Sequence, residues 1–263
     1  VGNKFTFGEV LIGGATSRNP DITGLNVIAN IDELLLEPWL EFVQNFMRES
    51  ANESESDFLK RIDLNLKNLS AYGQNFEQTD LLFTKPAEHW QLDLSGDSIQ
   101  GRINIPSEKT ILDIQLEHII LAAGLSDDDV LTSEEALKSE ADSDVFDPRL
   151  LPEMTFSTKK LVYNTHNYGS WRTHVMPSDQ GSIFSGLKGN IKGTTFDGQL
   201  NWKYDDSDKK SHTSILTLEV QGDKVEELTK SIGRPPLISS EKFNASIGLV
   251  WPDDPLSFEL ANV

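Results

Sequence analysis

The stretch FNASIGLVWPDDPLSFELANV, residues 243–263, contains the pattern that decides the fold. Apolar side chains occupy alternate positions from Phe243 to Trp251, a Pro-Asp-Asp-Pro sequence follows, and a second alternating run extends to Leu260. A period of two, interrupted by turn residues, predicts a β-hairpin with one apolar face. The sequence stops before anything could cover the second strand, and its opening VGNKFTFGEV lacks both Met and a signal-peptide pattern. We therefore expect an internal fragment of a longer protein.

The same alternation recurs along the chain. Further runs lie at residues 25–31, 62–66, 90–94, 112–116, 200–204 and 216–220. The residues between the apolar ones are mostly Asp, Asn, Gln, Lys, Glu and Thr. Strands with one wet and one dry face favour antiparallel pairing over a parallel sheet buried on both sides. The sequence therefore predicts a mainly β (α+β) fold with an antiparallel sheet.

Two short helices interrupt this pattern. The first is predicted over residues 38–48, because Pro38 suits a first helical position and apolar residues follow with helical spacing. The second is predicted over residues 223–232. Asp223 and Glu226 have the spacing of a capping box, and Gly233 suits the C-terminal cap.

A weak internal repeat indicates that one β unit occurs twice. RIDLNLKNLSAYGQNF, which begins at residue 61, resembles EMTFSTKKLVYNTHNY, which begins at residue 153. Further on, Gly101 in SIQGRINI corresponds to Gly198 in TFDGQLNW. We expect each copy to be a set of antiparallel strands laid down in sequence order.

An acidic segment lies between the two copies. We predict a first β unit over residues 1–125, an acidic connection over 126–147 and a second β unit over 148–263, with one continuous sheet as the alternative. The connection has no calcium-loop spacing, so a solvated linker or a short helix is the favoured interpretation.

Composition excludes several classes of function. The chain has 42 acidic and 23 basic residues and a net charge of −19, which argues against nucleic-acid binding. It contains no cysteine, which rules out disulfides, thiolate metal sites and cysteine nucleophiles. No run approaches the ~20 apolar residues of a membrane-spanning helix.

The sequence contains no catalytic motif. There is no HExxH or GxSxG pattern, and the glycine-rich GLKGNIKG lacks the end of a phosphate-binding loop. His118 follows the parity of the apolar residues 112–116 and is predicted to be a core histidine. The other histidines are His89, His166, His174 and His212. We predict no enzyme, no catalytic or metal-ligating residues and no cofactor.

The closing part of the chain resembles the AsmA-like region of the YhdP family of Gram-negative bacteria. There, a strand leads into a glycine-bounded short helix and then into a strand that ends in Trp-Pro, followed by a Phe-x-Leu run. The residues that carry the resemblance are Gly222, Asp223, Leu228, Gly233, Trp251, Pro252, Pro255, Phe258 and Leu260. Asp253-Asp254 stands where the family commonly has Gly-Ser. The upstream segment IDELLLEPWLEFV resembles the family's strand-to-helix element.

This resemblance implies a segment of an inner-membrane-anchored, periplasm-spanning lipid-transfer protein. It implies an elongated, curved sheet of repeated β units, whose apolar groove carries phospholipid acyl chains toward the outer membrane. Membrane anchoring would belong to parts of the parent protein outside this fragment, and other envelope proteins are further candidate partners. The groove candidates on the apolar face are Leu92, Leu94, Leu116, Leu218, Val220, Ile247 and Leu249.

Three alternatives remain open from the sequence. The apolar face could fill a closed β-sandwich core and bind nothing. The chain could be a non-enzymatic periplasmic scaffold in outer-membrane biogenesis, which predicts a localised exposed patch rather than contacts along many strands. A carbohydrate-binding module is the third alternative, and its candidate platforms are Trp90, Trp171, Trp202 and Trp251.

Overall fold

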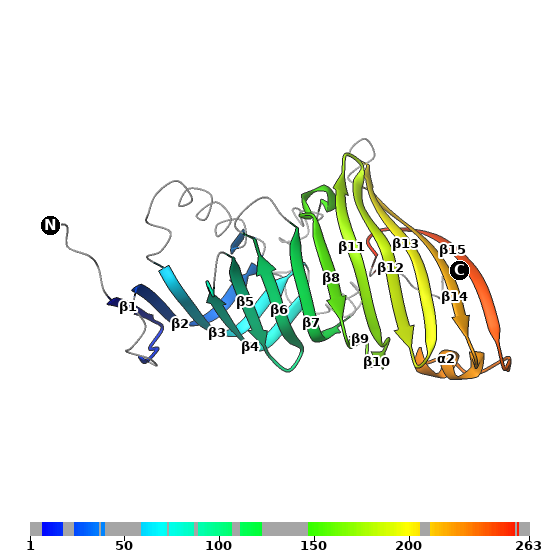
Figure 1. Ribbon diagram of the computed structural model, residues 1–263, viewed down its shortest axis with the longest axis horizontal. Helices are drawn as coiled ribbons and strands as arrows, with labels where there is room; N and C mark the ends of the chain where they lie inside the picture. The colour runs from blue at the N-terminus through cyan, green and yellow to red at the C-terminus, as the bar shows by residue number, and fades with distance from the viewer. Residues whose placement is uncertain are drawn as a thin grey trace, which may run out of the picture. The chain divides into compact units, whose positions relative to one another are not determined.

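β-strands make up nearly all of the regular structure. A computed structural model describes residues 7–17, 24–36, 38–39, 59–72, 74–86, 89–106, 111–122, 147–205, 211–255 and 257. In these ranges the chain forms fifteen strands, one α-helix that is described over its full length and one 3-10 turn (Figure 1). The predicted mainly β class is therefore confirmed. Internal contacts divide the chain into two compact units, residues 1–119 and 120–263.

Unit 1 contains a sheet whose strands are hydrogen-bonded in sequence order. The strands are β1 Phe7–Ile12, β2 Gly24–Leu35, β3 Leu59–Ala71, β4 Gln74–Thr84, β5 Trp90–Ser95, β6 Ile99–Ile105 and β7 Leu112–Leu121. From β3 to β7 all neighbours are antiparallel. The pairs β1–β2 and β2–β3 are parallel, so the expectation of a purely antiparallel sheet is wrong here. Alternation of apolar and polar residues shows which side chains share a face of the sheet, but it does not determine whether neighbouring strands are parallel or antiparallel.

Unit 2 contains a second run of strands and a 3-10 turn. Its elements are η4 Pro148–Leu150, β8 Met154–Thr158, β9 Leu161–Tyr163, β10 His166–Asn167, β11 Ser170–Ser178, β12 Gly181–Ile191, β13 Thr194–Asp205, β14 Ser211–Gly222, α2 Val225–Ser231 and β15 Phe243–Pro252. The strand order is β8-β11-β12-β13-β14-β15, and every neighbour is antiparallel. The short strands β9 and β10 pair as a hairpin. Within the described part of this unit, β8 and β15 do not pair with one another, so the sheet is open.

Helix α2 follows β14, close to its predicted place (Figure 1). Its N-cap is Lys224, which makes no capping hydrogen bond with its side chain, so the predicted capping box is wrong. The Glu226 carboxylate instead accepts a hydrogen bond from the Ser240 N–H at 3.4 Å. The C-terminal prediction is confirmed. Gly233 has a φ of 75°, and the N–H groups of Gly233 and Arg234 donate to helical carbonyls at 3.2 and 2.8 Å, as in a Schellman motif.

Most of the other predicted helix, residues 40–48, lies outside the described residues. Pro38 and Trp39 are helical. The Trp39 ring packs edge-on against Phe83 at 5.5 Å, and Phe83 stacks on Trp90 at 4.5 Å. In the predicted acidic connection, 126–147, only Asp147 is described, so those boundaries stay a prediction.

The two repeat copies share local geometry at equivalent positions. Tyr72 and Asn164 lie 92 residues apart in the sequence, and both have a positive φ, of 48° and 47°. A Cβ on Gly101 would lie 2.8 Å from the Leu116 side chain, and a Cβ on Gly198 would lie 2.9 Å from that of Leu218. In both copies a leucine of the next strand therefore covers a mid-strand glycine.

Candidate functional site: the apolar face of unit 2

Register in unit 2 aligns apolar side chains into rows that run across the strands. We define the unit 2 apolar face by three such rows. The first row contains Phe184, Leu200, Leu216 and Leu249; the second contains Leu187, Leu218 and Ile247 beside Gly198; the third contains Phe196, Val220 and Ala245. Because residues opposite one another in neighbouring strands point to the same side of a sheet, each row forms a continuous strip.

A bulge in β12 keeps the second row on this face. The register of β12 shifts between Phe184 and Leu187, and Gly186 between them has a φ of 57°. The extra residue moves Leu187 from the parity of the polar positions to the same face as Phe184.

The opposite face of unit 2 is mostly polar, although one of its rows contains Ile183, Ile215 and Val250, and Val250 is 69% exposed. The Lys188 ammonium lies 2.8 Å from the Asp197 carboxylate of the neighbouring strand. The Ser246 hydroxyl donates to the Glu219 carboxylate at 2.6 Å. Both pairs are in register across adjacent strands, so the predicted wet face is present along most of these strands.

Much of the unit 2 apolar face stays in contact with solvent. Leu216, Leu218 and Leu249 are half-buried, and Ile247 is 36% exposed. Val220 is the exception, with 1% of its surface exposed. The face is therefore an accessible apolar surface on β14 and β15, and not a filled core.

The corresponding face of unit 1 is closed. Nine of its side chains are between 0 and 5% exposed: Leu64, Leu66, Leu69, Leu81, Phe83, Trp90, Leu92, Leu94 and Leu116. The Trp39 ring packs on Phe83 and so covers part of this face, where Phe83 stacks on Trp90. In unit 1 the alternating pattern therefore builds a packed core.

The seven groove candidates are divided between these two environments. Leu92, Leu94 and Leu116 are buried in unit 1. In unit 2, Leu218 and Ile247 are direct partners across β14 and β15, with Leu249 and Val220 in the adjoining rows. Leu218, Ile247 and Leu249 are the accessible members, and lipid contact at any of the seven stays a prediction.

The tryptophans of unit 2 donate their indole N–H groups to the protein itself. Trp171 donates to the Tyr168 carbonyl at 2.7 Å, Trp202 to His212 at 2.8 Å, and Trp251 to the Asp254 carbonyl at 3.0 Å. All three are half-buried, and Trp90 in unit 1 is only 5% exposed. These contacts fit packing roles better than flat sugar-binding platforms.

The prediction of a core histidine named the wrong residue. His118 is half-buried, and its Nε2 lies 3.0 Å from the Asp97 carbonyl, because the β6–β7 register shifts nearby. His212 is the buried histidine, with 7% of its surface exposed. It shares the parity of Leu216 and Leu218 on β14, so the sequence pattern alone could have placed it on the apolar side of this strand.

Two further features concern metals and membranes. Across the ranges that the structure describes, no group of three or more His, Cys, Asp or Glu side chains could hold a metal ion. Among the described residues, α2 is far too short and polar to span a bilayer, and no other helix there is long and apolar enough.

Comparison with known proteins identifies the family. The family model described as "YhdP protein" matches residues 2–263, nearly the whole chain. No curated protein and no solved structure gives a significant match. The family match agrees with the motif order of strand, short helix and Trp-Pro-ended strand, which the structure places at β14, α2 and β15. This chain belongs to the YhdP family.

Proposed function

We propose that the chain is a segment of an inner-membrane-anchored, periplasm-spanning protein that carries phospholipid toward the outer membrane, with acyl chains on the unit 2 apolar face. The observation that carries this proposal is the set of in-register apolar rows that are left accessible on β14 and β15. Family membership supports it, because YhdP-like proteins resemble bridge-like lipid transporters.

The physical chemistry of such a surface suits acyl chains. Each methylene that leaves water gains about 0.8 kcal/mol, whichever lipid it belongs to. Rows of aliphatic side chains that run across strands offer similar surface at successive positions, so a chain could advance from one strand to the next. Neither a catalytic residue nor recognition of one headgroup is required.

Charge placement tests the proposal. Ile247→Lys puts an ammonium in the second apolar row, whereas the matched control Ser246→Lys puts it one residue away, beside Glu219 on the polar face. We expect the Ile247 variant of the intact parent protein to lose lipid transfer in cells, because desolvating an unpaired charge is costly. The Ser246 variant should retain transfer. Equal activity of the two variants, at equal protein level, would refute the proposal.

A scaffold in outer-membrane biogenesis is the second candidate, and one observation favours it. Leu237 and Ile238, which follow α2, are 88% and 66% exposed, and this is the localised apolar patch that a docking protein would present. Leu237→Ser with Ile238→Ser should then abolish function in cells, whereas Ile247→Lys should leave it unchanged.

A further inference from the structure

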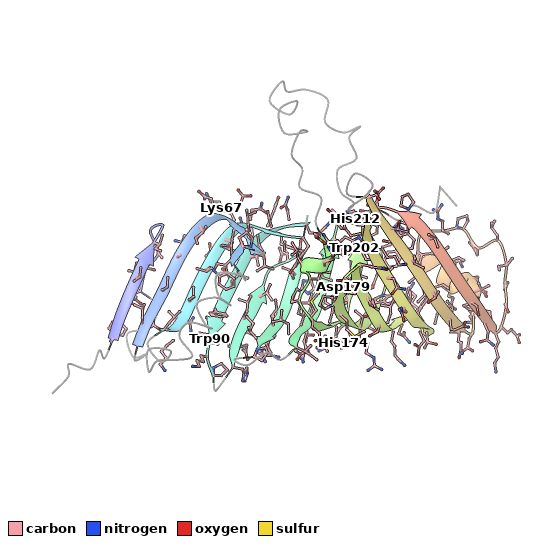
Figure 2. All side chains as sticks on the ribbon, turned by 90° about the horizontal axis from the view of Figure 1, so that it is seen from above. Lys67, Trp90, His174, Asp179, Trp202 and His212 are labelled. Carbon is pink, nitrogen blue, oxygen red and sulfur yellow. The ribbon has the colours of Figure 1, made fainter. Side chains whose placement is uncertain are left out.

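A buried histidine and a tryptophan are hydrogen-bonded at one end of the unit 2 apolar face. Trp202 lies on β13 beside Ser214 of β14, which places it next to the first apolar row. Its indole Nε1–H donates to His212 Nδ1 at 2.8 Å, and Figure 2 shows the two side chains together at one end of their strands. The two rings are tilted against each other with centroids 5.6 Å apart.

This hydrogen bond fixes the protonation state of His212. An indole N–H can only donate, so Nδ1 must offer its lone pair. The proton of the neutral ring is then on Nε2, which is buried and has no hydrogen-bond partner in the described part of the chain. A second proton could bind only at Nδ1, where it would meet the indole N–H.

Carboxylates approach the histidine from two other segments. Asp253 and Asp254 follow β15, and the Asp253 N–H donates to the His212 carbonyl at 3.1 Å. Asp147 precedes η4, and its nearest cation, Arg149, lies 2.6 Å away. Burial lowers the pKa of His212, and the charges of Asp254, Asp253 and Asp147 act against that effect.

An aromatic ring and a cation complete these surroundings. Tyr204 of β13 meets the imidazole edge-on at 5.2 Å. The Arg149 guanidinium lies over the Tyr204 ring, 4.6 Å from its centroid. The Ser182 hydroxyl donates to the Pro148 carbonyl at 2.6 Å, which holds η4 onto the end of the sheet.

We propose that the Trp202–His212 pair is an acid-sensitive latch that closes one end of the unit 2 apolar face. A proton taken up at Nδ1 places two N–H donors opposite one another, so the hydrogen bond to Trp202 is lost. The imidazolium then turns toward Asp253 and Asp254, and the Trp202 indole no longer bonds to it. The apolar face gains an accessible aromatic ring at this end.

The latch itself does not depend on the proposed function. If the unit 2 apolar face carries lipid, acidification would extend the surface that is available to acyl chains; this consequence rests on the proposed function. Loss of the latch and failure of lipid transfer are therefore separate results.

Solvent exchange of the Trp202 indole hydrogen tests the latch in the complete chain by NMR. At neutral pH this hydrogen should be protected, and the ¹⁵N shifts of His212 should report the Nε2–H tautomer. Acidification below about pH 6.5, the ordinary histidine value, should weaken the protection. Because one proton drives the opening, the open fraction should rise about tenfold for each unit of falling pH.

Two variants make the result specific. His212→Gln keeps an oxygen acceptor for the indole and cannot titrate, so its indole hydrogen should stay protected in acid. His174→Gln is the matched control. His174 lies on β11, where its Nε2 is 3.1 Å from the Glu153 carboxylate, and its replacement should leave the acid response of Trp202 unchanged. Three results would overturn the latch. His212 could carry its proton on Nδ1 in the unaltered chain, or the Trp202 indole hydrogen there could be equally protected at all pH values. The third is an equal loss of protection in the His212→Gln variant. The tautomer measurement needs no variant to fold.

Discussion

Unit 1 and unit 2 carry the same alternating pattern, yet their apolar faces differ in exposure. Leu92 in the middle of β5 is completely buried, whereas Ile247 in the middle of β15 is 36% exposed. The equivalent glycines Gly101 and Gly198 show that the local strand geometry is shared. One difference is the cover, since the Trp39 ring, which follows β2, packs edge-on against Phe83 of the unit 1 face. Alternation thus defines a dry face, and tertiary contacts decide whether it becomes a core or a surface.

The largest difference between the units should appear on truncation of apolar side chains. Leu92→Ala leaves a cavity in a closed core and should lower the free energy of unfolding of unit 1 by about 2–5 kcal/mol. Leu249→Ala removes a half-buried side chain and should cost unit 2 much less. Urea denaturation followed by circular dichroism would compare the two. Equal costs would contradict the distinction between a closed and an open face.

Glycine substitutions sharpen the same comparison within unit 2. A Cβ on Gly198 would lie 1.9 Å from the Thr217 carbonyl oxygen, so Gly198→Ala must push β13 from β14. We expect a loss of stability of about 1–3 kcal/mol, as for other overpacked positions. Gly248→Ala is the control, because nothing lies within 4 Å of its Cβ position. Thermal unfolding should separate the two variants, and a harmless Gly198→Ala would show that the strands are less tightly held.

A smaller effect is expected where α2 ends. Gly233→Ala places a side chain at a φ of 75° and directs its Cβ into the His166 ring, 2.2 Å from Nε2. The cost of the backbone conformation alone is about 1 kcal/mol. Amide hydrogen exchange should be faster in α2 and unchanged in β5 of unit 1. Faster exchange throughout both units would contradict a local role.

The smallest effect concerns Asp147 and Arg149. The hydrogen bond from Arg149, opposed by burial, lowers the pKa of Asp147. A lowered carboxyl pKa contributes stability that is present above the unfolded value, about 3.9, and is lost as pH falls through the folded value. Asp147→Asn should therefore lower the free energy of unfolding by less than about 1 kcal/mol at pH 7. In the variant, this free energy should also fall less steeply as the pH is lowered. An unchanged pH profile of unfolding would show that this pair contributes nothing.

The sequence predicted the class of fold and the parity of most strands. Residues 243–251 and 216–220 alternate regularly, and their apolar positions fall on one face of β15 and β14. Parallel pairing of β1, β2 and β3 was missed, because direction depends on connections that alternation does not encode. Leu187 was missed because the Gly186 bulge reverses its parity.

The candidate site was predictable to a similar extent. Parity selected Leu218, Ile247 and Leu249 correctly as members of the unit 2 apolar face, and it selected Leu92 by the same rule. Only the fold shows that Leu92 is covered. His212 was overlooked although it shares the parity of Leu216. A polar residue on an apolar face can be recognised as buried only when its hydrogen-bond partner is known, and that partner, Trp202, lies on the neighbouring strand.

Site-specific photocrosslinking along β15, in the intact parent protein in cells, tests the central claim most directly. Residues 244–248 are exposed on both faces of the sheet, so access alone would give adducts at every position. The account predicts phospholipid adducts at positions 245, 247 and 249, and none at 244, 246, 248 and 250. Adducts without this alternation, or no lipid adducts while Leu237 crosslinks to protein, would contradict a lipid-carrying apolar face.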